Sequence, residues 1–154
     1  MKRIRLDPEA YRLGHCFSVS LATTERASVF TEPEAVETCL STLKKTATRY
    51  EATVYAYCFM PDHLHLLVST PSGVNFIDFM RYFKQLSTYR LSRPSRSRRL
   101  WQARFYDHAL RLDEDIVNVA RYIFDNPVRA GIVPDAASYP YSGSLAWKDV
   151  FVGV

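Results

Sequence analysis

The sequence predicts an α+β protein, in which an antiparallel β-sheet carries helices on one face. Segments that alternate apolar and polar residues, as strands do, occur in the first 70 residues and again after residue 100. Two segments between them repeat apolar residues at helical spacing. With 154 residues, 47% of them hydrophobic and 23% charged, the chain suits one globular domain, 1–154, with 134–154 as a C-terminal tail.

The first half of the chain contains three predicted strands and one helix. Residues 15–23 alternate as a strand, and a helix is predicted over 33–50 because Pro33 suits a first turn and apolar residues repeat along one face. Residues 53–60 are rich in β-branched and aromatic side chains, which favour a strand. Pro61 and Asp62 supply a turn, so residues 63–70 return as the second strand of a hairpin.

The second half adds a helix over 74–91, a strand over 100–112 and a helix over 113–125. Asp113, Glu114 and Asp115 are favourably placed in the first turn of that last helix. The resulting order, β-α-β-β-α-β followed by a helix, is typical of the ferredoxin-like fold. This fold hosts metal-binding domains, RNA-binding modules and enzymes, so the function must come from particular residues.

A pair of histidines is the most informative feature of the chain. His63 and His65 stand one residue apart in a predicted strand, so both imidazoles project from the same face of the sheet. Leu64 and Leu66 then point to the opposite face, into a core. Imidazole is the commonest side-chain metal ligand. The spacing therefore indicates that two nitrogens can bind one ion.

Tyr122 and Asn126 lie four residues apart on one side of the last predicted helix. The apolar stripe of that helix lies elsewhere, at Ile116, Val119, Ala120 and Ile123. A tyrosine at a helix edge is most often a packing or interface residue, and an asparagine before a proline most often marks a turn. In the presence of the histidine pair, the two residues suggest instead a nucleophile and a third metal ligand, on a helix that ends near Pro127.

A basic segment indicates the class of partner. Arg93, Arg96, Arg98 and Arg99 lie among serines and a proline, and no acidic residue occurs between positions 81 and 99. The net charge is +4 and the sequence pI is about 9.0. A solvated loop is the plain explanation. A nucleic acid is the partner that such a segment suits, so we assign these four arginines to nucleic-acid binding.

Other residues limit the environment of the protein. Its three cysteines are odd in number and widely spaced, which predicts buried thiols outside disulfides in a reducing compartment. No apolar run approaches the roughly 20 residues of a membrane helix. We therefore expect no membrane association and a bacterial, cytoplasmic protein associated with the nucleoid. His15 is expected to be structural, and His108 could be a base, a phosphate ligand or structural.

Three stretches, taken in order, resemble the REP-associated tyrosine transposases, an IS200-like branch of the HUH transposases that act on single-stranded DNA. They are residues 57–67 (YCFMPDHLHLL), 101–111 (WQARFYDHALR) and 122–133 (YIFDNPVRAGIV). The weaker stretch 139–144 (YPYSGS) follows, with Gly143 where the family usually has a second adjacent serine. The likeness spans roughly residues 15–147.

The resemblance implies a metal-dependent endonuclease and transposase that cleaves and rejoins single-stranded DNA at hairpin, REP-like sequences. Tyr122 would be the nucleophile and form a 5′-phosphotyrosine intermediate. His63 and His65 would be the metal ligands of the HUH motif, with Asn126 as the third ligand. The family is regarded as dependent on Mg or Mn, and its members act as monomers or homodimers.

The chemistry of these residues agrees with that assignment. A tyrosine hydroxyl, with a pKa of about 10, is a weak nucleophile that must lose its proton near a metal or a base. A covalent intermediate keeps the energy of the broken bond, so no nucleotide cofactor is needed. Two imidazoles and an amide oxygen suit Mn or a later transition metal better than Mg by ligand softness.

Two alternatives stay open. A replication or conjugation nickase would use the same chemistry, although the chain is short and shows no helicase or relaxase extension. A catalytically inactive or host-domesticated nucleic-acid-binding module on a ferredoxin-like fold belongs to a different class. The aromatic signature of RNA-recognition motifs is missing, which argues against an RNA-binding module of that kind.

Overall fold

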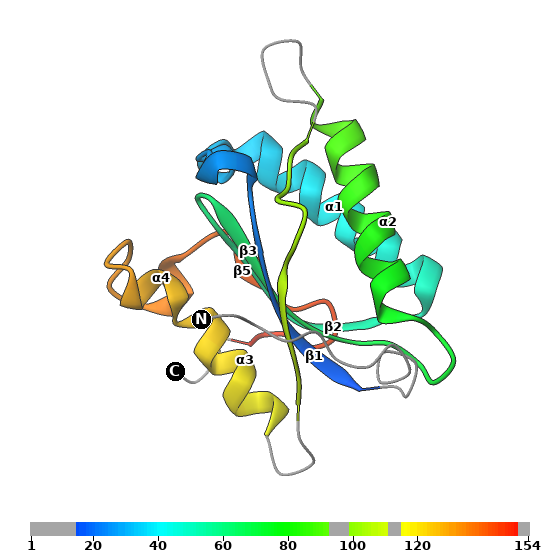
Figure 1. Ribbon diagram of the computed structural model, residues 1–154. Helices are drawn as coiled ribbons and strands as arrows, with labels where there is room; N and C mark the ends of the chain where they lie inside the picture. Colours follow the sequence, from blue (N-terminus) through cyan, green and yellow to red (C-terminus); the bar gives the residue numbers. More distant parts are fainter. Residues whose placement is uncertain (1–14, 93–98, 111–114, 151–154) are drawn as a thin grey trace.

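The computed structural model describes residues 15–92, 99–110 and 115–150. The described strands form one five-stranded antiparallel sheet in the order β4-β1-β3-β2-β5 (Figure 1). The strands are β1 (Cys16–Ala22), β2 (Thr53–Met60), β3 (His63–Ser69), β4 (Tyr106–Ala109) and β5 (Ser142–Gly143). The helices are α1 (Pro33–Tyr50), α2 (Phe76–Arg90), α3 (Ile116–Phe124) and α4 (Asn126–Arg129). The predicted α+β class and its β-α-β-β-α-β order are confirmed.

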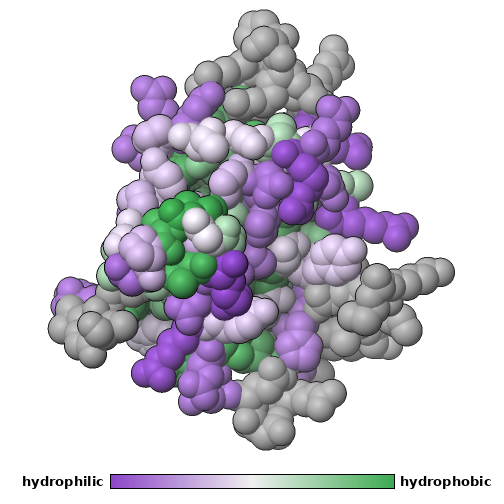
Figure 2. Space-filling view, turned by 90° about the vertical axis from the view of Figure 1, so that its left-hand side faces the viewer, coloured by the Kyte–Doolittle hydropathy of each residue, from purple (hydrophilic) through white to green (hydrophobic). Residues whose placement is uncertain are grey.

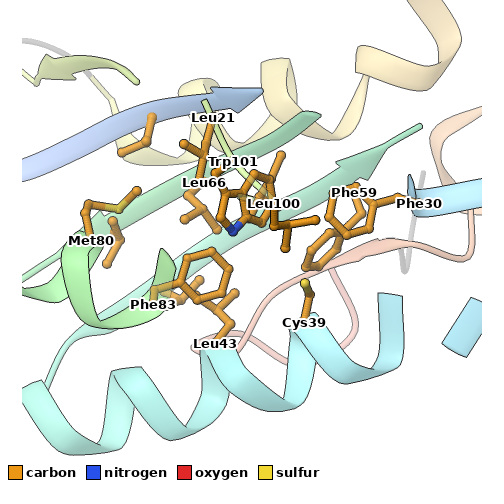
Figure 3. Packing of buried hydrophobic residues seen from close by; sticks show 14 of the residues in the cluster. Leu21, Phe30, Cys39, Leu43, Phe59, Leu66, Met80, Phe83, Leu100 and Trp101 are labelled. Carbon is orange, nitrogen blue, oxygen red and sulfur yellow. The ribbon is translucent and has the colours of Figure 1, made fainter. Parts of the chain in front are cut away.

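The sheet is covered on both faces. Helices α1 and α2 pack together on one face, and α3 packs on the other face against β2 and β3 (Figure 1). Two separate clusters of buried side chains result. The larger cluster lies under α1 and α2, where Trp101, Phe83 and Leu66 meet (Figure 3). The smaller cluster, under α3, contains Ala120 and Ile123 and makes α3 part of the fold.

Strands β1, β2 and β3 divide their side chains between these two clusters. In β1 every second residue, Phe17, Val19 and Leu21, is buried under α1 and α2, as the alternating pattern predicts. The pairing of β2 with β3 shifts between Val54 and Ala56, which marks an irregularity in β2. After it, Cys58 lies opposite His65 and Met60 lies opposite His63, all on the α3 face.

The strand predicted over residues 100–112 is wrong over most of its length. Trp101 makes only an isolated bridge with Thr23, and regular pairing with β1 is confined to β4. Trp101 is buried, and its indole Nε1 donates to the Ser87 hydroxyl at 2.8 Å. Lys84 Nζ donates to the carbonyls of Gln102 and Ala103, at 2.9 and 3.1 Å. These carbonyls therefore bind α2 and not the neighbouring strand.

The other helices and strands begin and end within a few residues of their predicted bounds. The structure has α1 and β2 at their predicted bounds, while α2 is shortened by two residues at the start and one at the end. Helix α3 begins at Ile116 because the Asp115 side chain caps it, accepting from the Val117 N–H at 2.8 Å. Asp113 and Glu114 lie outside the described residues.

Residues 134–150 are attached to the sheet through β2. The Tyr139 hydroxyl donates to the Phe59 carbonyl, and the Phe59 N–H donates to the Tyr141 carbonyl at 2.9 Å. Strand β5 then pairs with β2, and the Trp147 ring lies 5.2 Å from the ring of Tyr55. This segment closes the edge of the sheet beyond β2.

For the residues that it describes, the structure also tests the predictions about free cysteines and membrane-spanning helices. No disulfide joins the cysteines there: Cys39 and Cys58 are buried, and Cys16 is partly buried. None of its helices is long and apolar enough to cross a membrane.

Candidate active site

The structure brings the two predicted metal-binding histidines together. His63 and His65 lie on β3 with their Nε2 atoms 2.9 Å apart, while Leu64 and Leu66 between and after them are fully buried on the other face. Two ligands at right angles around an ion, each about 2.1 Å from it, are themselves about 3 Å apart. The pair therefore fits two neighbouring positions around one divalent ion.

Asp62 orients the first of these histidines. Its Oδ1 accepts a hydrogen bond of 2.7 Å from His63 Nδ1, and its Oδ2 is 3.0 Å from Arg26 Nε. Burial alone raises the pKa of Asp62, but the hydrogen bond from His63 and the charge of Arg26 lower that pKa by more. An ionised Asp62 can only accept, so Nδ1 of His63 carries a proton, and Nε2 faces His65.

The turn that carries Asp62 is tied to the segment after β1. Thr23 donates to the Asp62 carbonyl from its N–H and its hydroxyl, each at 3.0 Å. Glu25 and Arg26 have φ values of 56° and 54°, a left-handed conformation that is uncommon for residues other than glycine. This backbone brings Arg26 to Asp62. Left-handed residues of this kind often occur at functional sites.

His65 is neutral at physiological pH. Its pKa falls from 6.5 to about 4, first because of burial, then because of the charges of His63, Arg129 and Arg26. Only neutral imidazole binds a metal, so this environment prepares His65 for that role. Burial also raises the pKa of the neighbouring Cys58 thiol to about 12, which makes it a poor metal ligand.

Tyr122 has the exposure that its position off the apolar stripe predicts. It is 65% exposed on α3, whereas Ala120, Ile123 and Phe124 on the same helix are buried. The ring lies under the guanidinium of Arg129, whose Cζ is 3.7 Å from the ring centroid. Its hydroxyl is thus on a large accessible side chain that a cation holds in place.

Asn126 is held close to Tyr122 by its contacts within α3 and α4. Its Nδ2 donates to the Ile123 carbonyl at 3.0 Å, and its Oδ1 accepts from Arg129 Nη2 at 2.7 Å. The same Nη2 donates to the Tyr122 carbonyl at 2.8 Å. Within the described residues, neither Tyr122 nor Asn126 hydrogen-bonds to the histidine pair.

Two groups of contacts therefore make up the candidate site, one on β3 and one on α3 and α4. Helix α3 packs on β2 and β3, so the groups share one face of the sheet, and the charge of Arg129 acts on His65. Figure 2 shows the molecule from the side of α4, where hydrophilic side chains surround a small hydrophobic patch.

In the described part of the chain, no three His, Cys, Asp or Glu side chains cluster as a metal site would require. Asn126, which the sequence analysis assigned as a third ligand, is not one of these four residue types.

Several predicted residues lie away from this site or outside the described ranges. Arg93, Arg96 and Arg98 belong to residues 93–98, which the structure leaves undescribed, and Arg99 is exposed beside them. His108 is exposed on β4 with β1 between it and β3, so it does not adjoin the histidine pair. His15 lies with its ring 6.3 Å from Phe17, in an edge-to-face arrangement.

Sequence reasoning missed two arginines of the site. Arg26 is far from Asp62 in the chain, and no local sequence pattern predicts their pairing. Arg129 follows Tyr122 by seven residues and Asn126 by three, which is the spacing of one helix face. That signal was hidden because Pro127 predicts that the helix stops.

The fold and the site together define a class of α+β proteins in which the central strand of an antiparallel sheet carries a histidine pair and the helix packed on that face carries an exposed tyrosine. The profile of the family described as "Transposase IS200 like" matches residues 15–126. The chain belongs to the IS200-like transposase family. This confirms the predicted resemblance.

Similar proteins carry the name that the sequence analysis anticipated. The chain is 34% identical over 113 residues to a Haemophilus influenzae protein named provisionally as a REP-associated tyrosine transposase, and the match covers 66% of this chain and 64% of that protein. It is 28% identical over 89 residues to the REP-associated tyrosine transposase of Escherichia coli, covering 58% of this chain and 52% of that protein. The chain therefore aligns with between half and two thirds of the length of these relatives.

A solved structure supports the fold independently. The structure of a REP-associated tyrosine transposase bound to a REP hairpin matches with a TM-score of 0.76, covering 92% of this chain and 82% of that one. The sequence identity is 23%, so this match speaks for the shared fold.

Proposed function

We propose that the protein is a metal-dependent endonuclease and transposase that cleaves and rejoins single-stranded DNA at hairpin, REP-like sequences. The observation that carries this proposal is the pair of facing Nε2 atoms of His63 and His65 on the sheet face where α3 presents the exposed Tyr122. Family membership supports the class of reaction. The relative solved with a REP hairpin supports the class of substrate.

In the proposed reaction the Tyr122 hydroxyl oxygen attacks the phosphorus of a phosphodiester. The bond from phosphorus to the 3′ oxygen breaks, a bond from phosphorus to Tyr122 forms, and the leaving oxygen takes up a proton as a 3′ hydroxyl. The tyrosine proton passes to solvent or a nearby base. In the joining step a 3′ hydroxyl attacks the phosphotyrosine and reverses these changes, so no nucleotide cofactor is consumed.

His63, His65 and Asn126 are the residues that would hold a divalent ion, Mg or Mn. When bound, such an ion polarises the phosphate and neutralises charge on its oxygens. The chain itself contributes the orientation of both imidazoles through Asp62 and the neutrality of His65. Asn126 would bind through the second lone pair of its Oδ1, because Arg129 uses the first.

The test is capture of a covalent product. The protein is incubated with Mn²⁺ and a pool of single-stranded hairpins, and DNA that stays attached after denaturation is sequenced. We expect Tyr122→Phe to abolish the adduct while hairpin binding and the circular dichroism spectrum stay unchanged. Tyr89→Phe is the matched control, because Tyr89 is 80% exposed on α2, remote from the site.

Two outcomes would contradict the proposal. An adduct formed by Tyr122→Phe at the wild-type rate would assign the nucleophile to another residue. Hairpin binding without any adduct, under every divalent ion supplied, would favour the nucleic-acid-binding module. His63→Ala and His65→Ala should each abolish nicking and weaken Mn²⁺ binding measured by calorimetry.

A further inference from the structure

Arg129 occupies a central position in the candidate site. Its guanidinium lies on the ring of Tyr122, and its Nη2 donates to the Tyr122 carbonyl and to Asn126 Oδ1. A single side chain thus fixes both the proposed nucleophile and the proposed third ligand. Its positive charge also acts on His65 across the site.

Only part of the hydrogen-bonding capacity of Arg129 is used. A guanidinium has five N–H donors, and the two on Nη2 are engaged. The remaining three, on Nε and Nη1, donate to no residue of the described ranges, and no carboxylate there pairs with this arginine. By contrast, Arg26 and Arg81 are each paired with an aspartate.

An anion is the ligand that such a group suits. Arg129 is exposed, permanently charged and held within contact of the tyrosine ring. Hydrogen bonds from a guanidinium to phosphate oxygens are among the strong ones in proteins. The phosphate that Tyr122 would attack must come within reach of the Tyr122 hydroxyl, at the far end of the ring that the guanidinium covers.

We propose that Arg129 binds the scissile phosphate of the DNA through its Nε and Nη1 donors while Nη2 holds Tyr122 and Asn126 in place. This inference rests on the proposed function, since it presumes that Tyr122 attacks that phosphate. It assigns a substrate-binding role to a residue that is neither a metal ligand nor a nucleophile. The planar fork of an arginine, which a lysine lacks, suits this double use.

The experiment removes either the charge of the phosphate or the charge of Arg129. The 5′ end of DNA in the wild-type adduct identifies the scissile phosphate, and a hairpin is made with an uncharged methylphosphonate at that position. Binding of both DNAs is measured without metal, in the Tyr122→Phe background, so that no cleavage occurs. With Arg129 present we expect the methylphosphonate to weaken binding about tenfold. With Arg129→Gln added, the two DNAs should bind within about twofold of each other.

The matched control is Arg121→Gln, which removes an equal charge from an exposed position on α3. It should retain the tenfold difference between the two DNAs. Arg129→Met, which keeps an apolar stem, repeats the test if Arg129→Gln fails to fold by circular dichroism. In active protein, Arg129→Lys should lower the cleavage rate at saturating DNA, because the three donors on one ammonium cannot hold the Tyr122 carbonyl and Asn126 and also present a planar fork to the phosphate.

The results separate this inference from the proposed function. A tenfold difference that persists in Arg129→Gln or Arg129→Met overturns the phosphate contact and leaves the nuclease intact. Failure of the wild-type protein to form any adduct overturns both proposals. A difference that disappears only when Arg129 is replaced supports the contact.

Discussion

The ring of His63 is fixed at Nδ1 and presents Nε2 toward His65, which is the arrangement a metal ligand needs. Asp62 binds its Nδ1 and itself pairs with Arg26, so the ring is fixed while Nε2 faces His65. Carboxylates that orient a ligating histidine raise its basicity and select its tautomer. The strand spacing of the two histidines predicts their pairing, but the ion pair that holds Asp62 comes from Arg26, 36 positions earlier in the chain than Asp62.

We predict that Asp62→Ala weakens Mn²⁺ binding about 10- to 100-fold, because partners of ligating histidines contribute effects of that size. Isothermal calorimetry on the metal-free protein measures the change. Asp78→Ala is the control, since it removes a carboxylate that pairs with Arg81 on α2, away from the histidines. Unchanged Mn²⁺ affinity in Asp62→Ala would show that the Asp62–His63 hydrogen bond does not support a metal site.

At the scale of elements, the joint between α3 and α4 decides how Arg129 lies against Tyr122, the proposed nucleophile. Pro127 interrupts the helix as the sequence predicts, but Asp125 stays near helical dihedrals and α4 follows at once. The Arg129 N–H still donates to the Asp125 carbonyl at 2.9 Å, and Gly131, with φ of 74°, then turns the chain away. This near-continuity places Arg129 seven residues on from Tyr122, on the same side.

Strand β5 shows what limits the size of the residue at position 143. A Cβ at Gly143 would lie 2.6 Å from the Tyr57 hydroxyl oxygen and 3.0 Å from Cζ of that ring. Gly143 pairs with Tyr57 across β2 and β5, so the ring covers the glycine directly. This crowding lies at the sheet edge, outside the candidate site.

We predict that Gly143→Ser lowers the free energy of unfolding by about 1–3 kcal/mol, as overpacking usually does. Urea denaturation measures the loss. In a Tyr57→Val background the added serine should cost much less, because the crowding ring is gone, and Ala146→Ser on the same segment should be neutral. An equal loss in both backgrounds would mean that Tyr57 is not the obstacle.

At the scale of the whole molecule, the basic segment, residues 93–99, is separate in the sequence from the residues of the candidate site. Helix α2, which precedes this segment, packs on one face of the sheet, whereas the histidine pair and α3 lie on the other face. Phosphate contacts at such a segment would position DNA without reading its sequence. Binding and cleavage should therefore respond differently to changes in the two regions.

We predict that replacing Arg96, Arg98 and Arg99 by alanine flattens the dependence of log affinity on log salt by roughly two units for single-stranded DNA. Preference among hairpins should stay the same. The control replaces Lys44, Lys45 and Lys148, three exposed lysines elsewhere on the surface, and should leave the slope closer to wild type. An unchanged slope in the arginine variant would assign residues 93–99 to solvent.

A second prediction at this scale concerns which chain supplies Tyr122. Ala120 and Ile123 pack α3 on the sheet of its own chain, and Arg129 acts on His65 of that same chain. A mixture of Tyr122→Phe with His65→Ala should therefore form no adduct, because no active site is complete. Recovery of adducts on mixing would show that two copies exchange α3 and share their sites.

The sequence by itself determined the order of strands and helices, the face on which His63 and His65 stand, and the exposure of Tyr122. Each of these depends on local periodicity, which a short window of residues contains. Only the tertiary structure decided that α3 covers the opposite face from α1 and α2. It also decided that Trp101 is buried in the core and does not lie in a regular strand, and that Arg26 pairs with Asp62. These features depend on contacts between distant segments, whose packing outweighs local preference.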